Sequence, residues 1–168
     1  MAKKLLMKGR DSTNLLPVFR EMILNSGIKE GENLIWAGCQ GTCYGMATFL
    51  TFGIRDLNFN LYYAVDADVQ KLWKLEYMKD LGIIAVKREN PVMAKVLILM
   101  SGLTRVPFQN VSKIIDDVLA SDGLIIGETV VPGLFEKEKW SQIPFRYVFE
   151  FSMENPSSFE IHRKGGHP

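Results

Sequence analysis

Short, continuous apolar runs recur along this chain, and segments with helical spacing lie between them. The run from Val96 to Met100 is apolar at every residue, as expected of a central parallel strand covered on both faces. Similar runs occupy residues 33–37, 61–65 and 124–127. Strands that alternate with helices predict an α/β fold, namely a doubly wound, mostly parallel sheet of five or six strands.

The segments between the apolar runs predict helices. Residues 13–26 carry apolar side chains at helical spacing after several polar residues suited to capping. A second helix is expected from the turn after the first strand to about Arg55, a third over 68–81 and a fourth over 110–122. Further short strands are expected at 83–86 and 145–151.

The length and apolar content of the chain predict a single domain. The chain has 168 residues, of which 47% are hydrophobic, so it can bury a core without cross-links. We expect the domain to span residues 1–151, with its core over 32–151 and an N-terminal helix over 13–26. The remaining segment, 152–168, is rich in Pro, Ser and Gly and is expected to be a flexible tail.

Charge and hydropathy exclude two classes of partner. Lys and Arg number 20 against 19 Asp and Glu, so the net charge of +1 provides no long-range attraction to nucleic acid. The apolar runs fall far short of the roughly 20 residues that cross a bilayer, so no transmembrane segment is expected. The apolar stretch within residues 1–10 is too short for a signal peptide. We therefore expect a cytoplasmic protein.

A glycine-rich turn, Gly38 to Gly45, joins the first apolar run to the following helical pattern and contains both cysteines of the chain. A strand that enters a helix through such a turn leaves backbone N–H groups at the positive end of the helix. These groups attract anions, thiolates and partner carboxylates. We therefore predict that the turn contacts a ligand or partner through Gly38, Gln40, Gly41, Thr42 and Tyr44.

Cys39 and Cys43 are four residues apart in this turn. In a regular helix that separation lies near the upper end of disulfide reach, and an irregular turn brings the cysteines closer. The helix N-terminus predicts thiolate character for Cys43. We expect a redox-responsive pair, and the alternative is that both cysteines are small apolar residues packed beneath the turn.

Other loops are expected to join the glycine-rich turn. In a doubly wound sheet, ligands meet the carboxyl ends of the strands, so the loops after the other strands should gather there. An alternative for the two aspartates after the second strand is a helix cap and a solvated loop residue. The topology thus predicts further ligand or partner contacts at Asp66, Asp68, Ser101, Gly102, Glu128 and Thr129.

The turn does not match the motifs of nucleotide, metal or catalytic cysteine sites. Its glycines lack the close pair of G-x-G-x-x-G, and no Lys follows as in a P-loop. A cysteine nucleophile needs a general base, whereas His162 and His167 lie in the expected tail. Two cysteines are too few for a structural zinc site, which needs four ligands. An iron-sulfur cluster needs a third cysteine, and Met46 occupies that position. We expect no catalytic residues, metal or cofactor; the alternative is a nucleotide- or flavin-binding enzyme that uses this loop.

Several segments together resemble an archaeal family of methanogens, the domain of unknown function 2124 family. The resemblance covers roughly residues 32–151 and implies a Rossmann-like or flavodoxin-like fold in a strictly anaerobic cytoplasm. It is carried by Ile35–Cys43, Val65–Val69, Leu97–Leu103, Gly127, Phe135 and Trp140.

The resemblance also implies a role beside the methane-forming machinery. Members look like accessory proteins of the membrane methyltransferase that moves a methyl group from tetrahydromethanopterin to coenzyme M through a corrinoid. The implied partner is the corrinoid-carrying subunit of that complex, and the implied location is its cytoplasmic periphery. With Cys39 and Cys43, this predicts a regulatory binding protein of methanogenesis with redox-sensing cysteines, not an enzyme. The resemblance assigns no catalytic residues.

Overall fold

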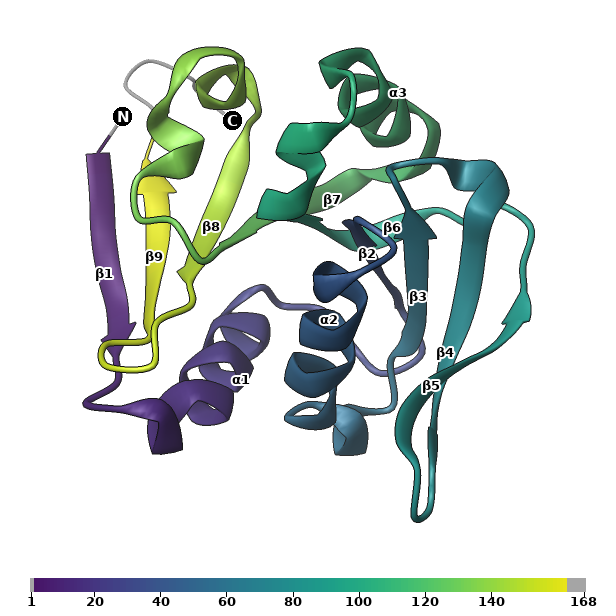
Figure 1. Ribbon diagram of the computed structural model, residues 1–168, viewed down its shortest axis with the longest axis horizontal. Coiled ribbons are helices and arrows are strands. Elements are labelled where there is room, and N and C mark those ends of the chain that lie inside the picture. The colour runs from purple at the N-terminus through teal and green to yellow at the C-terminus, as the bar shows by residue number, and fades with distance from the viewer. Residues whose placement is uncertain (1, 163–168) are drawn as a thin grey trace.

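The computed structural model describes residues 2–162, which form one sheet of nine strands with helices on both faces (Figure 1). The helices are α1 (Leu15–Asn25), α2 (Thr42–Phe52) and α3 (Phe108–Val118). The strands are β1 (Ala2–Lys8), β2 (Asn33–Gly38), β3 (Asn60–Val65), β4 (Leu72–Met78), β5 (Gly82–Arg88), β6 (Ala94–Met100), β7 (Leu119–Thr129), β8 (Phe145–Glu150) and β9 (Ser157–His162).

The sheet is mixed, with the strand order β1-β9-β8-β7-β6-β2-β3-β4-β5. Neighbours from β8 to β3 are parallel, whereas β9 and β1 extend one edge and β4 and β5 the other in antiparallel pairing. Four of the eight pairings are therefore antiparallel. The prediction of a doubly wound, mostly parallel sheet of five or six strands is wrong, because the sheet has nine strands of mixed direction.

Most of the predicted central elements are confirmed within a few residues. The helices expected over 13–26, after the glycine-rich turn and over 110–122 correspond to α1, α2 and α3. The apolar runs correspond to β2, β3, β6 and β7, and the strands expected at 83–86 and 145–151 correspond to β5 and β8. The unit β2-α2-β3 joins two parallel neighbours. The helices were predictable from the regular spacing of their apolar residues, and the central strands from their continuous apolar runs.

The helix expected over 68–81 is absent, and a short 3-10 turn η3 (Val69–Lys71) and the β4–β5 hairpin take its place. Leu72 and Leu75 are buried three residues apart, which imitates helical spacing. Strand pairing with β3 prevails because Trp73 and Tyr77 favour extended backbone. Asp80 then adopts the left-handed conformation that the hairpin turn requires.

The flexible tail expected over 152–168 is wrong for residues 157–162, which form β9 between β1 and β8. Ser157 and Ser158 are buried there. Their small polar side chains do not indicate a strand. This segment is held in the sheet by backbone hydrogen bonds to both neighbouring strands. Residues 163–168 lie outside the described part of the chain.

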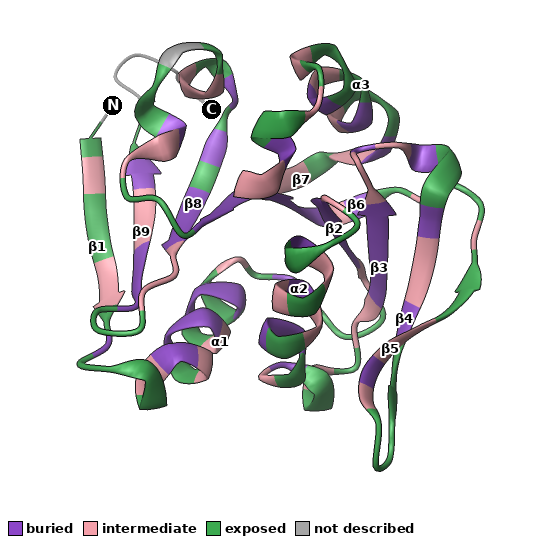
Figure 2. Ribbon diagram, viewed as in Figure 1, coloured by how far each residue is buried: buried purple, intermediate pink, exposed green. Residues whose placement is uncertain are grey.

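The core has two layers, one on each face of the sheet (Figure 2). Successive residues of β2 alternate between them: Leu34 and Trp36 pack with α1 and α2, and Ile35 and Ala37 pack on the opposite face, where α3 lies. Figure 2 shows the central strands buried, with exposed residues on the outer sides of the helices. This arrangement fixes which strand-end residues can meet.

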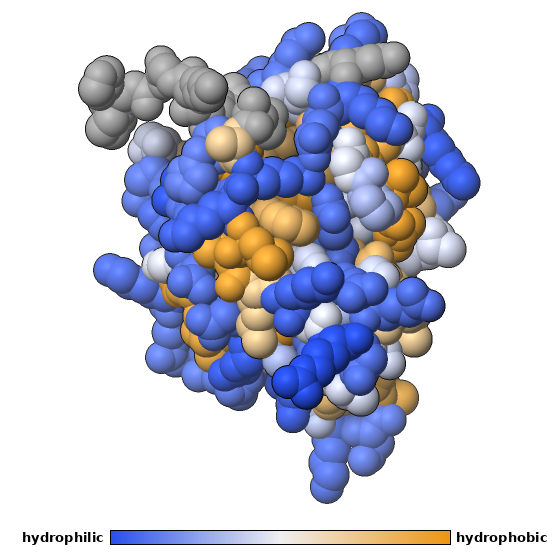
Figure 3. Space-filling view, turned by 90° about the vertical axis from the view of Figure 1, so that its left-hand side faces the viewer, coloured by the Kyte–Doolittle hydropathy of each residue, from blue (hydrophilic) through white to orange (hydrophobic). Residues whose placement is uncertain are grey.

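The β1 edge of the sheet carries charged side chains. Lys4 and Lys8 are exposed on this strand, beside the half-exposed Leu5. Figure 3 faces this side of the molecule and shows hydrophilic residues surrounding limited apolar patches. Lysines on an edge strand oppose pairing with another chain. Among the described residues, no helix combines the length and apolar character needed to span a membrane.

Candidate functional site

The glycine-rich turn lies between the carboxyl end of β2 and the start of α2. The parallel strands β3, β6 and β7 end at the same edge of the sheet. Gly41 is the N-cap residue of α2 and has no side chain that could cap the helix. The first backbone amides of α2 are therefore free to donate hydrogen bonds to another acceptor. The sulfur of Cys39 accepts hydrogen bonds from the amides of Gly41 and Cys43.

Cys39 and Cys43 lie together at this helix start as free cysteines. Their Sγ atoms are 3.0 Å apart, within hydrogen-bond distance. Cys39 is half-buried, whereas Cys43 is only 6% exposed. The pair therefore presents one accessible sulfur with the second sulfur directly beneath it.

The two thiols differ in acidity. Burial opposes ionisation of Cys39, but hydrogen bonds from the Cys43 thiol, backbone amides and the Thr42 hydroxyl outweigh it, so the pKa of Cys39 is lowered. Burial, followed by the hydrogen bond with Cys39, raises the pKa of Cys43 to about 12. The prediction of thiolate character for Cys43 is wrong, because the amide groups of the turn are directed at Cys39.

The cysteines open onto a cavity of about 210 Å³ that we call the cysteine pocket. Residues from the turn, from the end of β6 and from the end of β7 meet in it, as expected for strands that end at one edge. The predicted residues Thr42, Ser101, Gly102 and Glu128 join the cysteines there. The other residues that line it are Met46, Met100, Arg105 and Val130.

Glu128 contributes a buried carboxyl group to the cysteine pocket. Glu128 is only 2% exposed, and its Oε1 atom has no hydrogen-bond partner. Burial raises the pKa of Glu128 to about 7, although a hydrogen bond from the Ser101 amide acts in the opposite direction. The carboxyl group can therefore gain or lose a proton near neutral pH.

Gly102 allows the 3-10 segment η4 (Ser101–Arg105) to approach the cysteines closely. A Cβ atom at this position would lie 2.2 Å from Cys43 Sγ and 3.0 Å from Cys39 Sγ, so a larger residue cannot fit without movement. The Gly102 amide donates a hydrogen bond to the sulfur of Cys43. The role of this glycine is thus to bring its backbone against the sulfur.

Three of the predicted residues, Thr129, Gln40 and Tyr44, lie on other surfaces. Thr129 follows Glu128 on β7 and faces the opposite side of the sheet, where its hydroxyl exchanges hydrogen bonds with the backbone of Val131. Gln40 and Tyr44 line a separate pocket of about 310 Å³, bounded mainly by aromatic residues. The Tyr44 hydroxyl accepts a hydrogen bond from the Ala85 amide. The remaining two predicted residues, Gly38 and Gly41, have no side chains and belong to the backbone of the glycine-rich turn.

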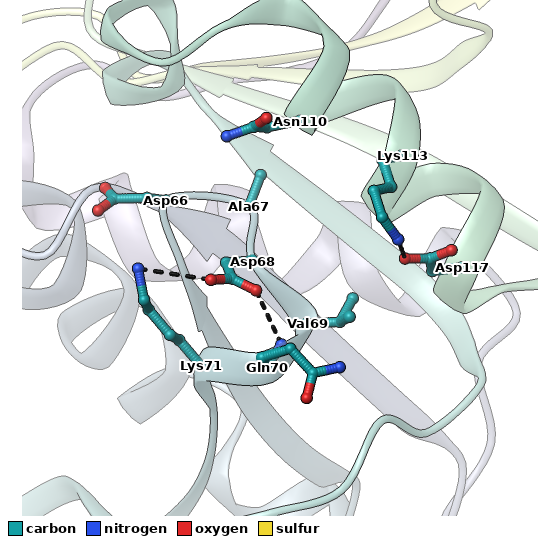
Figure 4. Close-up of a pocket in the computed structure, with 9 residues that line it drawn as sticks. All are labelled: Asp66, Ala67, Asp68, Val69, Gln70, Lys71, Asn110, Lys113 and Asp117. Carbon is teal, nitrogen blue, oxygen red and sulfur yellow. Dashed lines mark hydrogen bonds and ion pairs between the residues drawn. The ribbon is translucent and has the colours of Figure 1, made fainter.

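Asp66 and Asp68 line a third pocket, of about 380 Å³, between the end of β3 and α3 (Figure 4). Asp68 accepts a hydrogen bond from the Gln70 amide at 2.9 Å and pairs with Lys71 at 3.4 Å. On α3, Lys113 pairs with Asp117. Figure 4 shows Asp68 with Lys71 and Gln70, and Lys113 with Asp117, and it draws no interaction for Asp66. Asp68 fits the alternative expectation of a helix cap.

Sequence reasoning missed several residues around the cysteines. Tyr63 donates a hydrogen bond from its hydroxyl to the Cys39 carbonyl at 2.5 Å, which fixes the turn from beneath. Met100 is the last residue of β6 and packs against Gly38. Its position at a strand end was a usable signal, as was the spacing of Met46 three residues after Cys43. The binding of a nucleotide or flavin stays a prediction.

One family model matches most of this chain. The family model described as "Uncharacterized protein conserved in archaea (DUF2124)" matches residues 12–154. An uncharacterized protein of Methanothermobacter thermautotrophicus is 28% identical over 135 residues, which cover 76% of this chain and 80% of that protein. A crystal structure of a protein of unknown function from Methanothermobacter thermautotrophicus matches with a TM-score of 0.74 and 23% identity, over 88% of this chain and 92% of that chain.

Proposed function

Because the chain belongs to the archaeal DUF2124 family, described only as uncharacterized, we propose its function from the cysteine pocket itself. The protein is a redox-responsive binding protein in which Cys39 and Cys43 convert between a dithiol and a disulfide. The observation that carries this proposal is the separation of 3.0 Å between the two free sulfurs. A disulfide bond of about 2.05 Å requires only a small further approach.

The asymmetry of the pair supports exchange with an external disulfide. The sulfur of Cys39 is accessible and has a lowered pKa, so its thiolate is the attacking nucleophile. Cys43 is buried beneath it and is placed to displace the first product from Cys39. Formation of the bond pulls the two sulfurs together at the first turn of α2, which alters the surface that Gln40 and Thr42 present.

We propose a protein partner for this surface, with the corrinoid-carrying subunit of the methanogen methyltransferase as the first choice. This choice follows from the resemblance described above, and it places the protein in the cytoplasm at the periphery of that membrane complex. The near-neutral net charge of +1 is compatible with a protein partner and provides no general attraction to nucleic acid. The oxidation state of the cysteine pair then sets the affinity.

Thiol counting tests the chemical part of the proposal. The reduced protein is expected to show two reactive thiols after denaturation, and treatment with glutathione disulfide should leave none, with a monomer mass lower by two hydrogen atoms. The matched control is Cys43→Ser, which should instead retain glutathione on Cys39 as a stable mixed disulfide. Retention of both thiols by the wild type, or disulfides that form only between molecules, contradicts the proposal.

Affinity capture tests the binding part. The wild-type protein is immobilised once as the dithiol and once as the disulfide, and the Cys39→Ser/Cys43→Ser double variant serves as a form that cannot switch. Each is exposed to methanogen lysate under anaerobic conditions. We expect the corrinoid-carrying subunit to be recovered in amounts that differ several-fold between the two wild-type states and not between treatments of the double variant. Equal recovery in both states, or no recovery in either, contradicts the proposed partner.

A further inference from the structure

Two successive backbone amides hold the Glu128 carboxyl group and the Cys43 sulfur next to each other. The Ser101 amide donates to Glu128, and the following amide, that of Gly102, donates to Cys43. Consecutive residues are about 3.8 Å apart along the chain, so the two acceptors occupy neighbouring positions on η4. Both groups line the cysteine pocket. Residues from α2, η4 and β7 thus place a carboxyl group beside a buried thiol.

Apart from the Ser101 amide, the Glu128 carboxyl group has no hydrogen-bond partner in the described part of the chain, and one of its oxygens is left unpaired. Its Oε1 atom is buried without a hydrogen bond, and its side chain forms no ion pair with the other described residues. An unsatisfied buried carboxyl group costs stability and is rare in native proteins. Such a group is retained where its proton is used.

The cysteine pair has a specific need for a proton acceptor. Cys43 must lose its proton before its sulfur can attack, yet burial strongly disfavours the thiolate. His162 lies on β9 with its Nε2 3.4 Å from Glu160, and it does not line the cysteine pocket. His167 lies outside the described residues. Glu128 is the carboxyl group that the structure places in this pocket.

We propose that Glu128 accepts the proton of Cys43 when the disulfide forms and returns it when the disulfide is reduced. This inference rests on the proposed function. The oxidant is a disulfide RS–SR, either of a small thiol or of a partner protein. The Cys39 thiolate attacks one sulfur of RS–SR, so a Cys39–SR bond forms and RS⁻ leaves.

The second step completes the exchange. Cys43 transfers its proton to the Glu128 carboxylate, and its sulfur attacks Cys39 Sγ, which forms the Cys39–Cys43 bond and releases a second RS⁻. The two cysteine sulfurs are oxidised by two electrons together, and RS–SR is reduced to two thiolates. On reduction by two RS⁻ the steps reverse, and protonated Glu128 returns the proton to Cys43.

The groups that face Glu128 decide how its titration appears. Cys39 and Cys43 line the cysteine pocket from the turn and α2, Arg105 lines it from η4, and Tyr63 on β3 interacts electrostatically with Glu128. Burial raises the pKa of Tyr63 above its ordinary value, so its hydroxyl stays protonated. The inflection expected near neutral pH therefore belongs to Glu128, since burial raises the pKa of Cys43 above its ordinary value.

The test is the rate at which the mixed disulfide of Cys39 with glutathione is resolved, followed by release of glutathione from about pH 5 to about pH 9. In the wild type the rate should rise through about pH 7 as Glu128 becomes a carboxylate able to accept a proton. In Glu128→Gln this inflection should disappear and the rate at the alkaline end should fall about 100-fold. The matched control, Glu89→Gln on the surface beyond β5, should retain the wild-type profile.

A stability measurement separates a proton-transfer role from a misfolded variant. The folded state raises the Glu128 pKa from 4.5 to about 7, so protonation favours folding, and this contribution is lost as the pH rises through about 7. Glu128→Gln should fold and should lack this pH-dependent loss in urea unfolding. If Glu128→Gln resolves the mixed disulfide with the same pH inflection as the wild type, Glu128 is not the proton acceptor, whereas the proposed disulfide formation still stands. If the wild type forms no internal disulfide, the proposed function itself fails.

Discussion

Replacement of Phe19 by alanine is expected to lower the free energy of unfolding by about 3–5 kcal/mol. The Phe19 side chain is fully buried on α1, its ring stacks on Trp36 with centroids 5.5 Å apart, and its edge meets Phe149 at 5.4 Å. Removal of the ring leaves a cavity between α1 and strands β2 and β8, which the rigid sheet cannot close. Urea unfolding followed by tryptophan fluorescence measures the loss.

The matched control for this prediction is Phe49→Ala. Phe49 is an aromatic residue of the same size on α2, but its side chain is 47% exposed. Its replacement should change the free energy of unfolding by no more than about 0.5 kcal/mol. Equal losses for the two variants would contradict the assignment of Phe19 to the centre of the core.

Alkylation of the reduced protein should discriminate strongly between the two cysteines. At pH 7 we expect Cys39 to react with iodoacetamide at least about 100-fold faster than Cys43, because only the thiolate reacts and each unit of pKa changes its fraction tenfold. The pKa of Cys39 is lowered and that of Cys43 is raised to about 12. The lower nucleophilicity of a more acidic thiolate offsets only part of this difference. Peptide mass spectrometry after timed quenching measures both rates.

Single variants separate acidity from access in this experiment. In Cys39→Ser, the remaining Cys43 should stay slow at pH 7, because it is still buried. In Cys43→Ala, Cys39 should react more slowly than in the wild type at pH 7, since the hydrogen bond from the Cys43 thiol that lowers its pKa is lost. Comparable rates for the two cysteines in the wild type would contradict the assigned roles of attacking and buried sulfur.

The parallel strands β2 and β6 were predictable from the sequence because each buries all but one of its residues. Leu34 and Ile35 pack on opposite faces, and a run of this kind leaves no alternative to a covered strand. The antiparallel strands β1 and β9, which extend one side of the sheet, carry no such signal. Ser158 in β9 and Lys4 in β1 are placed by backbone pairing, which the side chains do not reveal. Strand β4 was mistaken for a helix because Leu72 and Leu75 happen to match a helical interval.

The composition of the cysteine pocket was partly predictable for a related reason. Parallel strands end at one edge, so Ser101, Gly102 and Glu128 could be expected near Cys39 and Cys43. The face on which each residue points was not available without the strand register, and Thr129 was therefore grouped with Glu128 although the two side chains lie on opposite faces. The inverted acidities of the cysteines depend on the directions of individual amide groups, which sequence spacing does not specify.

The pairing of β1 with β9 has a consequence for how the protein is made. Ala2 pairs with His162, and Lys8 pairs with Ser157, so β1 has no strand to join until β9 has been synthesised. Contacts between positions so distant in sequence form slowly. Assembly of this edge is therefore expected to be a late event in folding, after α1 and the inner strands have already gathered.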